Sequence, residues 1–487
     1  MEYLQLDPIP TLVVNDIATV VSEAQMHPAL SKNQLIFKKS EGAPIRLLSY
    51  NILLDAFCDS HWALNHLYPY LNTRYSRIDY RSQLAATEII GWNPDMICLQ
   101  EVSEHVHQYL MHRLGMEGMD GFYANKISEQ PFGSSIFWNT NRFELKRKWI
   151  LDLTKEWYDL PNADALCKAD PTFAKKMEQT TTTSQVVLLC DRTRNQVQSK
   201  PPNPPAGEFI LVNIHLFSNP HAPHIRILQV ATILQKIEQQ YPKHPVFITG
   251  DFNADDHSGC TEYIRSFVVR EDNYEWAEGS VFGDIRSESQ EEREGNWHKV
   301  MLREHEIRVR NMFSLMDSKE TGTGLLELSN IQSLISGLNL SPFSQKCWDR
   351  NHFCYAQFYQ AFASMRLHST EDFDLVIKTL ETKFGSTPED VERTPKVHIG
   401  CCDYPRTTLK HSFNVSPVYK GEQITYFAGL NPKPESLDHM FYPVDYFQLS
   451  GKSPAIPEEV LKENTALPSI YFPSDHTALI ADFTWKI

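Results

Sequence analysis

Polar residues suited to metal-assisted phosphate chemistry lie at the ends of five short apolar motifs. In order, the motifs are SYNIL (49–53), LQE (99–101), NIHL (213–216), GDFN (250–253) and SDH (474–476). The residues of interest are Asn51, Glu101, His215, Asp251, Asn253, Asp475 and His476. Carboxylate and amide oxygens hold Mg²⁺, and acids and bases beside the ion direct water at phosphorus. Together, the motifs predict a Mg²⁺-dependent phosphodiester hydrolase with one or two ions.

Each motif taken alone also has a local explanation. Asn51 and Glu101 make a partial Mg²⁺ shell, or they cap a turn and a helix respectively. Gly250 permits a tight turn after a strand, so that Asp251 and Asn253 can face one phosphate; a simple Asx turn is the alternative. The order of the motifs, rather than any single one, favours the catalytic interpretation.

The two histidines have a similar choice of roles. One His on an apolar strand is typically a core residue whose ring nitrogens are satisfied. Two of them, His215 and His476, with Asp and Asn neighbours favour catalysis, because a protonated imidazole stabilises charge that develops on a phosphoryl group. Asp438, in LDHMFYP (437–443), adds a carboxylate that can fix the tautomer of one imidazole.

The elements that must position these residues alternate between strands and helices. Strands are predicted where short apolar, β-branched runs are flanked by Pro, Gly or Asn: 45–51, 95–101, 135–139, 185–190, 209–216 and 245–253. Apolar residues at helical spacing predict helices over 79–92 and 224–241. This alternation predicts a layered α/β fold, with two packed sheets and helices outside. The polar stretch 161–183 is predicted to be an exposed loop.

A helical insertion is predicted in the second half of the chain. The expected organisation is an N-terminal extension (1–43), a first α/β part (44–290), the insertion (291–395) and a second α/β part (396–487). Within the insertion, 313–338 has the pattern of an EF-hand helix, loop and helix, and 351–365 that of a truncated partner.

Calcium binding by this insertion is not expected. A working loop needs oxygen ligands at fixed positions and a Glu at position 12. A loop starting at Asp317 has Lys319 third and Leu328 twelfth, and one starting at Lys319 ends on Asn330. We therefore expect a structural or partner-binding helix pair rather than a calcium sensor.

Composition narrows the function classes. The chain has 487 residues, 41% of them hydrophobic, and a net charge of −15. That charge argues against a general polyanion binder, because non-specific nucleic-acid affinity comes mostly from Lys and Arg. The nine cysteines are scattered without CxxC pairs, as expected in a reducing compartment without structural zinc. The acidic first 40 residues, without a signal-like apolar run, predict a cytoplasmic protein without a membrane partner.

The motif set SYNIL, LQE, NIHL, GDFN, LDHMF and SDH resembles the endonuclease/exonuclease/phosphatase superfamily, whose fold is a two-layer β-sandwich flanked by helices (DNase I-like). LSYNILLDAF, SSIFWNTNRFEL and HIRILQ resemble its deadenylase branch of CCR4, nocturnin and angel proteins. LYPYL, NIHLFSNPHAPHIRILQ and ALPSIYFPSDHTALIADFTW are most similar to the 2′,5′-phosphodiesterases within that branch. The resemblance covers 44–285 and 396–487.

The resemblance implies a role for each residue. Asn51 and Glu101 would hold the first Mg²⁺, with Asp475 beside it. Asp251 would orient or deprotonate water, Asn253 and His215 would contact the phosphate, and His476, paired with Asp438, would stabilise the transition state. Pro220 would pack on a base and Arg226 would contact a phosphate, although loop punctuation and a solvated helix residue are their alternatives. Tyr426 or Phe427 would supply the stacking aromatic.

The implied activity is removal of adenylates from RNA 3′ ends or from 2′,5′-oligoadenylate. Alternatives are a nocturnin-like phosphatase acting on a dinucleotide 2′-phosphate, and an inert scaffold with a partner-binding insertion. A DNA-repair nuclease is a weaker option. The chain departs from the family pattern at Ile214, His439 and Met440, none of which removes a catalytic group.

Overall fold

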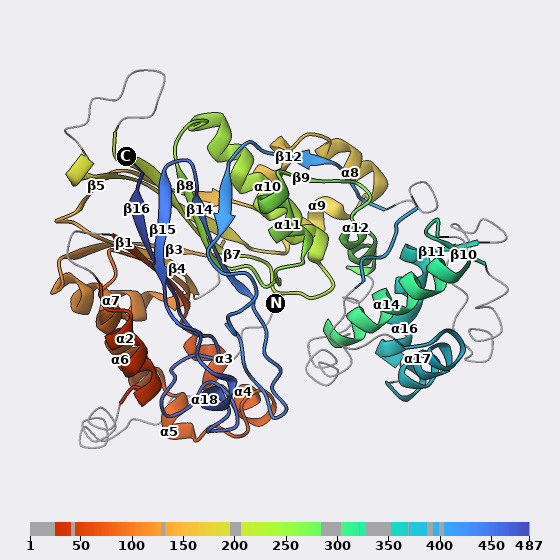
Figure 1. Cartoon of the computed structure of the whole chain (residues 1–487), viewed down its shortest axis with the longest axis horizontal. Helices are drawn as coiled ribbons and strands as arrows, with labels where there is room; N and C mark the ends of the chain where they lie inside the picture. Colours follow the sequence, from red (N-terminus) through yellow and green to blue (C-terminus); the bar gives the residue numbers. More distant parts are fainter. Residues whose placement is uncertain are drawn as a thin grey trace.

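Two six-stranded mixed sheets form the centre of the molecule (Figure 1). The computed structural model describes residues 25–39, 44–127, 132–194, 206–283, 303–320, 322–327, 352–368, 370–386, 393–398 and 404–486. The first sheet has the order β15 (Phe447–Lys452), β16 (Leu479–Trp485), β1 (Ile45–Asn51), β2 (Met96–Ser103), β4 (Phe132–Asn139) and β3 (Met119–Asn125). The second has β13 (Val415–Pro417), β14 (Asp438–Pro443), β8 (Val246–Asp251), β7 (Glu208–His215), β6 (Thr183–Asp191) and β5 (Phe143–Asp152).

Side-chain alternation along the strands builds the core between the sheets. Successive residues of a strand face opposite sides. In β1, Leu47 joins an apolar cluster with Leu211 of β7 and Phe247 of β8, across the two sheets. Leu48 of the same strand instead packs in a cluster with α6 (Ile78–Trp92) and α7 (Glu104–Gly115). Each sheet therefore buries both faces, one on its partner sheet and one on helices.

Helices cover the outer faces of both sheets (Figure 1). Residues of α6 and α7 pack on the first sheet, and those of α10 (Pro223–Gln240), α11 (Gly259–Ser266) and α12 (Tyr274–Glu278) pack on the second. α10 begins with Pro223, whose missing N–H costs nothing at a helix start. The shorter described elements are α2 (Pro28–Ile36), α3 (Asp55–Cys58), α4 (His61–His66), α5 (Thr73–Ser76), α18 (Glu458–Leu461), β9 (Val268–Val269) and β12 (Leu409–Lys410).

The predicted sandwich and its motif strands are confirmed, but the predicted loop over 161–183 is wrong. That stretch forms α8 (Ala163–Ala169) and α9 (Phe173–Glu178) before β6. Leu166, Phe173 and Met177 are buried against Trp157 and the core of the second sheet. Three buried apolar side chains therefore anchor these two short helices to the core. The polar residues around them in the sequence led to the prediction of a loop.

The insertion contains three described helices beside the second sheet: α14 (Arg303–Glu320), α16 (Tyr355–His368) and α17 (Thr370–Phe384). The loop after α14 pairs through β10 (Leu325–Glu327) with β11 (His352–Cys354), which precedes α16. Asp317 Oδ1 accepts a hydrogen bond from Gly324 N at 2.8 Å, so this carboxylate closes the loop. The second helix predicted for the EF-hand, with Leu328 and Asn330, lies outside the described residues, and the EF-hand stays a prediction.

A buried ionic cluster joins the insertion to α12. The Arg310 guanidinium of α14 donates to both carboxylate oxygens of Glu278, at 2.7 and 2.8 Å. Tyr355 of α16 donates to the same carboxylate at 2.5 Å, and Tyr359 donates to Glu306 at 2.9 Å. Charge pairing and hydrogen bonds thus fix the insertion against the helices of the second sheet. Among the described residues, no helix combines the length and apolar character needed to cross a membrane.

Candidate active site

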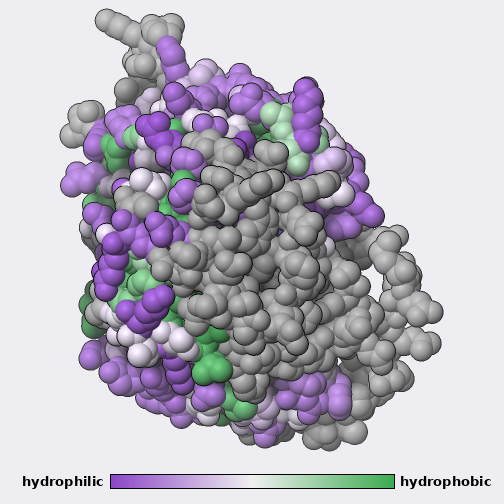
Figure 2. Space-filling view, turned by 90° about the vertical axis from the view of Figure 1, so that its right-hand side faces the viewer, coloured by the Kyte–Doolittle hydropathy of each residue, from purple (hydrophilic) through white to green (hydrophobic). Residues whose placement is uncertain are grey.

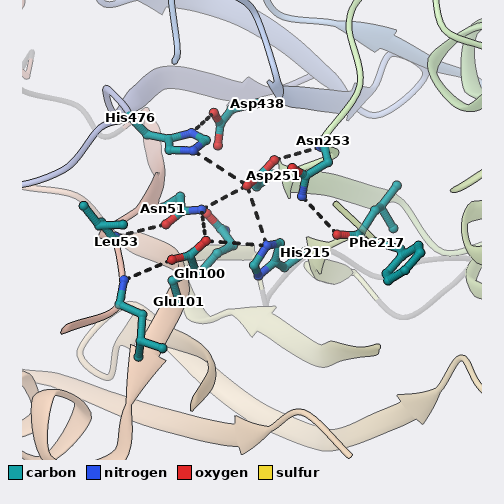
Figure 3. A network of polar contacts seen from close by, with 12 residues as sticks. Asn51, Leu53, Gln100, Glu101, His215, Phe217, Asp251, Asn253, Asp438 and His476 are labelled. Atoms are coloured by element: carbon teal, nitrogen blue, oxygen red, sulfur yellow. Dashed lines mark hydrogen bonds and ion pairs between the residues drawn. The ribbon is translucent and has the colours of Figure 1, made fainter. Parts of the chain in front are cut away.

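The inward-facing rows of three strands, β1, β7 and β8, end in polar residues at one edge of the sandwich. Asn51 follows Leu47 and Ser49 along β1, and His215 follows Leu211 and Asn213 along β7. Asp251 is the last inward-facing residue of β8. Strands β1 and β2 run parallel, and so do β7 and β8. Because parallel strands end at the same edge, their last side chains meet there. Figure 3 shows these side chains pointing toward one another.

Glu101 reaches this edge through a β-bulge. The pairing of β2 with β4 shifts between Gln100 and Val102. Glu101, between them, has φ +55°, a left-handed conformation that is uncommon outside glycine. Without the extra residue, alternation would turn Glu101 toward the helices, as it turns Leu99. The bulge instead brings the carboxylate to the site, where Oε2 accepts from Leu54 N at 3.0 Å.

Asn51 links two of the carboxylates. Its Nδ2 donates to Glu101 Oε1 at 3.1 Å and to Asp251 Oδ2 at 2.9 Å. Its Oδ1 accepts from Leu53 N at 3.0 Å, as the turn-cap alternative predicts. In this orientation the amide presents donors to the site, so ligation of a cation by Asn51 requires the amide to turn.

GDFN forms a tight turn that only its glycine permits. Gly250 has φ +140°, and a Cβ there would lie 2.0 Å from Ile214 O. Asp251 Oδ1 accepts from Asn253 N at 2.8 Å, and Asn253 Nδ2 donates to Leu216 O at 3.0 Å. Burial, and then the charge of Asp438, raise the pKa of Asp251 to about 7. Asp251 is therefore poised to exchange a proton near neutral pH.

His476 and Asp438 form the buried pair expected for a held imidazole. Asp438 lies opposite Asp251 in the antiparallel pairing of β14 with β8. His476 Nδ1 and Asp438 Oδ2 are 2.7 Å apart, and His476 Nε2 lies 3.9 Å from Asp251 Oδ2. Burial alone would lower the pKa of His476, but the charge of Asp438 and its hydrogen bond raise it well above the ordinary value. The ring is thus held as an imidazolium with Nε2 directed at Asp251.

His215 has the opposite electrostatic setting. Its Nε2 lies 3.7 Å from Asp251 Oδ2 and 3.9 Å from Glu101 Oε1. Burial, and then the charge of Lys126, lower its pKa well below the ordinary value. One site therefore contains a neutral imidazole and a charged one, which suits the first for hydrogen bonding and the second for stabilising negative charge.

A divalent cation fits the acidic side of this site. The potential ligand atoms of Glu101, His215 and Asp251 all lie within 4.8 Å of one another, and so do those of Asp251, Asp438 and His476. Burial, and then the charge of Asp475, raise the pKa of Glu101. Carboxylates so crowded gain from a cation, and Mg²⁺ commonly takes one or two of them. Because His476 is held by Asp438, the cluster with Glu101 suits the ion better.

Asp475 lies beside the site with a separate partner. Its Oδ2 accepts from Tyr68 Oη at 2.8 Å, and it lines the same pocket as Glu101 and His476. Asp475 belongs to neither of the two ligand clusters found among the described residues. Its predicted place beside the metal stays a prediction.

Pro220 and Arg226 line the same pocket, which has a volume of about 400 Å³. Arg226 is buried rather than solvated, so that alternative is wrong. Its Nη1 donates to Phe217 O at 3.2 Å and to Asn219 O at 2.8 Å, and thereby holds the loop that carries Pro220. Contact of either residue with a substrate stays a prediction.

The structure adds Lys126 to the pocket and decides between the two aromatic candidates, Tyr426 and Phe427. Lys126, which follows β3, contacts the ring of Phe132 at 4.9 Å and lines the pocket. Burial lowers its pKa, which the charges of Glu101 and Asp251 partly offset. Tyr426 also lines the pocket and its ring packs edge-on against His476, whereas Phe427 is fully buried in another apolar cluster. Of the two aromatics considered, Tyr426 is the one available for stacking.

Comparison with known proteins identifies relatives of the part of the chain that carries this site. Residues 48–259 match the Endonuclease/Exonuclease/phosphatase family. Human 2′,5′-phosphodiesterase 12 is 30% identical over 252 residues, which are 49% of this chain and 39% of the human protein. The CCR4-Not complex 3′-5′-exoribonuclease subunit Ccr4 of Schizosaccharomyces pombe is 21% identical over 461 residues, 92% of this chain and 50% of that protein. The chain thus spans half or less of the length of these relatives.

A solved structure extends the likeness in fold to most of the chain. ANGEL2, a 2′,3′-cyclic phosphatase solved with adenosine-2′,3′-vanadate, superposes with a TM-score of 0.52 and 16% identity. The superposition covers 91% of this chain and 96% of ANGEL2. The fold and the family match point to the same kind of protein. Both the two packed sheets and the site at their edge lie in the part of the chain that the comparisons cover. Residues 48–259 are thus similar to the Endonuclease/Exonuclease/phosphatase family, and the relatives of this chain include 2′,5′-phosphodiesterase 12 and Ccr4 exoribonuclease subunits.

Proposed function

We propose that this protein is a Mg²⁺-dependent phosphodiesterase that removes adenylates from the 3′ end of RNA or from 2′,5′-oligoadenylate. The observation that carries the proposal is the meeting of Glu101, Asp251 and the His476–Asp438 pair at one edge of the sandwich. Hydrolase chemistry is common to the family, the name of the Ccr4 relative supplies the exoribonuclease class, and the adenylate class comes from the sequence resemblance.

The proposed mechanism divides the chemistry between two sides of the site. Glu101 and Asp251 would hold Mg²⁺, with Asn51 if its amide turns, and the ion would polarise a phosphate oxygen. Asp251 would also orient the attacking water and accept its proton. The His476 imidazolium, held by Asp438, would stabilise negative charge developing on the phosphoryl group. Asn253 and the neutral His215 would hydrogen-bond to phosphate oxygens.

A substrate panel tests the proposal against the leading alternative. The protein is incubated with poly(A), 2′,5′-oligoadenylate and NADPH, with and without Mg²⁺. Shortened oligomers and released AMP are expected only with the ion. If NADPH alone loses inorganic phosphate and both oligomers stay intact, the exonuclease assignment is wrong and the dinucleotide 2′-phosphatase takes its place.

A variant pair tests the residues and the inert-scaffold alternative. Glu101→Ala should abolish hydrolysis while leaving the unfolding transition in place. Glu117→Ala, exposed just beyond α7, is the matched control and should retain wild-type turnover. Unchanged turnover in Glu101→Ala would contradict the site assignment. A cytoplasmic location and a protein partner for the insertion stay predictions from the sequence.

A further inference from the structure

The insertion forms part of the wall of the catalytic pocket. Glu306 and Arg310 of α14 line the same pocket as Glu101, His215 and the other site residues. Arg310 is held there by Glu278 and by the ring of Tyr274, whose centroid lies 4.6 Å from the guanidinium carbon. A segment without catalytic motifs therefore contacts the space that a substrate must enter.

A second, larger cleft lies between the insertion and the catalytic half. Its volume is about 2450 Å³. The lining comes from α14 and α17 on the insertion, and from residues 65–69, 255–257, 415–417 and most of 420–437 outside it. Asp255, Tyr426, Glu435 and Leu437 line both this cleft and the catalytic pocket. The two spaces are therefore continuous, and a chain that leaves the catalytic pocket beside Tyr426 enters the cleft.

The charge of this cleft differs from that of the whole chain. Its five Lys and Arg side chains match five Asp and Glu, in a protein of net charge −15. On the insertion wall, Arg308 Nη1 lies 3.0 Å from Asp374 Oδ1 and Nη2 lies 3.7 Å from Glu381 Oε1, so one guanidinium pairs with two of the acids. Lys378 of α17 remains exposed on that wall, and Lys420 and Lys433 are exposed on the opposite one. Cations on both walls suit a phosphate backbone between them.

The size of the cleft favours an extended chain over a small ligand. Small-molecule pockets have volumes of about 300–1,000 Å³, less than half that of this cleft. Figure 2 faces the side of the molecule on which the insertion lies, and the residues coloured there are mostly hydrophilic, with small apolar patches. Tyr426 at the junction offers a ring for stacking, and cations with aromatic rings are how single strands are bound without base-specific hydrogen bonds.

We propose that the cleft between the insertion and residues 415–437 holds the single-stranded oligonucleotide chain next to the nucleotide being removed, so that the insertion is a substrate-binding wall. This inference rests on the proposed exonuclease function. It gives the helical module a role that requires no calcium, and it makes Lys378 a residue that binds substrate remote from the reacting phosphate.

Binding is measured separately from cleavage. Fluorescence anisotropy records the affinity of labelled oligoadenylate dimer, tetramer and octamer for the full chain in EDTA, over about 50–300 mM KCl. The octamer is expected to bind at least about tenfold more tightly than the dimer, because each phosphate contact adds affinity. Lys378→Ala and Lys433→Ala should each lower the salt slope for the octamer by about one and leave dimer binding unchanged.

A lysine on the same helix supplies the matched control. Lys383 also belongs to α17 but does not line the cleft, and its ammonium lies over the ring of Phe384 at 5.0 Å. Lys383→Ala should keep the wild-type slope and affinity for every length. Equal binding of dimer and octamer, or a wild-type slope in Lys378→Ala, would overturn the inference and leave the cleft to a protein partner or another ligand.

The two proposals fail in different ways. Length-dependent, Lys378-dependent binding without hydrolysis of any oligomer in Mg²⁺ would refute the exonuclease function and keep the cleft as a single-strand site. Hydrolysis with length-independent binding would keep the enzyme and refute the cleft assignment. Circular dichroism of each variant excludes loss of the insertion fold as the cause.

Discussion

The pairing of His476 with Asp438 makes the most demanding prediction. In Asp438→Asn, the amide keeps the shape of the carboxylate but loses its charge. The wild-type pair is buried, with 6% and 1% of the two side chains exposed and 2.7 Å between Nδ1 and Oδ2. Because Asp438 is the main group that raises the pKa of His476, the variant should leave this imidazole neutral at neutral pH.

The magnitude follows from the burial of the pair. Two unit charges at 2.7 Å attract by about 6 kcal/mol at an effective dielectric constant of about 20, and desolvation of both groups offsets part of this. Breaking one partner of a buried pair costs about 3–5 kcal/mol. At about 1.4 kcal/mol per tenfold, a loss of this size in the transition state corresponds to a rate reduction of between about 10²- and 10⁴-fold.

The assay is the pH dependence of kcat/KM for oligoadenylate, together with urea unfolding. Since the folded pKa of His476 lies above its ordinary value of 6.5, the imidazolium persists in the wild type into alkaline pH. In Asp438→Asn the alkaline fall in activity should therefore move to lower pH. The stabilisation from the raised pKa is fully present below about pH 6.5 and is lost as pH rises through the folded pKa. The stability gap between the two proteins should thus narrow as pH rises.

A second histidine–carboxylate pair provides the control. His244 Nε2 and Glu208 Oε2 are 3.3 Å apart. They lie where β7 and β8 begin, at the end of these strands away from the candidate site. Glu208→Gln should leave the alkaline limb of the pH profile where the wild type has it. If Asp438→Asn keeps the wild-type limb, or if both variants shift it equally, the assignment of His476 as the charged catalytic imidazole is wrong.

Three further outcomes are expected. Arg310→Met should destabilise the protein to urea by about 3–5 kcal/mol, because Glu278 is left buried and uncompensated, whereas Arg308→Met breaks exposed pairs and should cost less than about 1 kcal/mol. If Arg310→Met and Arg308→Met lose similar amounts of unfolding free energy, burial of the Arg310–Glu278 pair is not the cause of the destabilisation. Mg²⁺ binding should release protons, and its affinity should rise between about pH 6 and 8, because Asp251 with its pKa of about 7 must lose its proton to ligate. Calorimetry in buffers of different ionisation enthalpy measures the number of protons released. Binding without proton release would show that the ion does not bind at Asp251. Gly250→Ala should destabilise by more than about 1 kcal/mol and remove activity, because its Cβ would overlap Ile214 O, while Gly115→Ala, with open space around it, should be tolerated in a thermal scan.

Strand alternation explains why most of the site could be predicted from the sequence. Asn51, His215 and Asp251 each end an apolar run whose length and composition indicate a buried strand, so their meeting at one edge follows from the strand order. The position of Glu101 at this edge could not be predicted from the strand pattern. The bulge that turns it inward depends on pairing with β4, which periodicity alone cannot reveal.

Contacts between distant segments account for what the sequence did not predict. Lys126 follows β3 without a motif, and only the fold brings it to Glu101. The helices α8 and α9 carry few large apolar side chains, and the burial of Phe173 and Met177 becomes apparent only in the core cluster that contains Trp157. The approach of Arg310 to Glu278 arises from the docking of the insertion, which no local pattern specifies.

The pairing of β8 with β14 has a consequence for the timing of synthesis. Asp251 and Asp438 are neighbours in the sheet, yet the whole insertion is made between them. Ser474 Oγ donates to Asn51 O at 2.7 Å across 423 residues. At about 5–20 residues per second, the ribosome needs about 10–45 s after Asp251 to reach His476. Until His476 has been made, the nascent chain carries Glu101 and Asp251 without the imidazolium that the proposed hydrolysis requires.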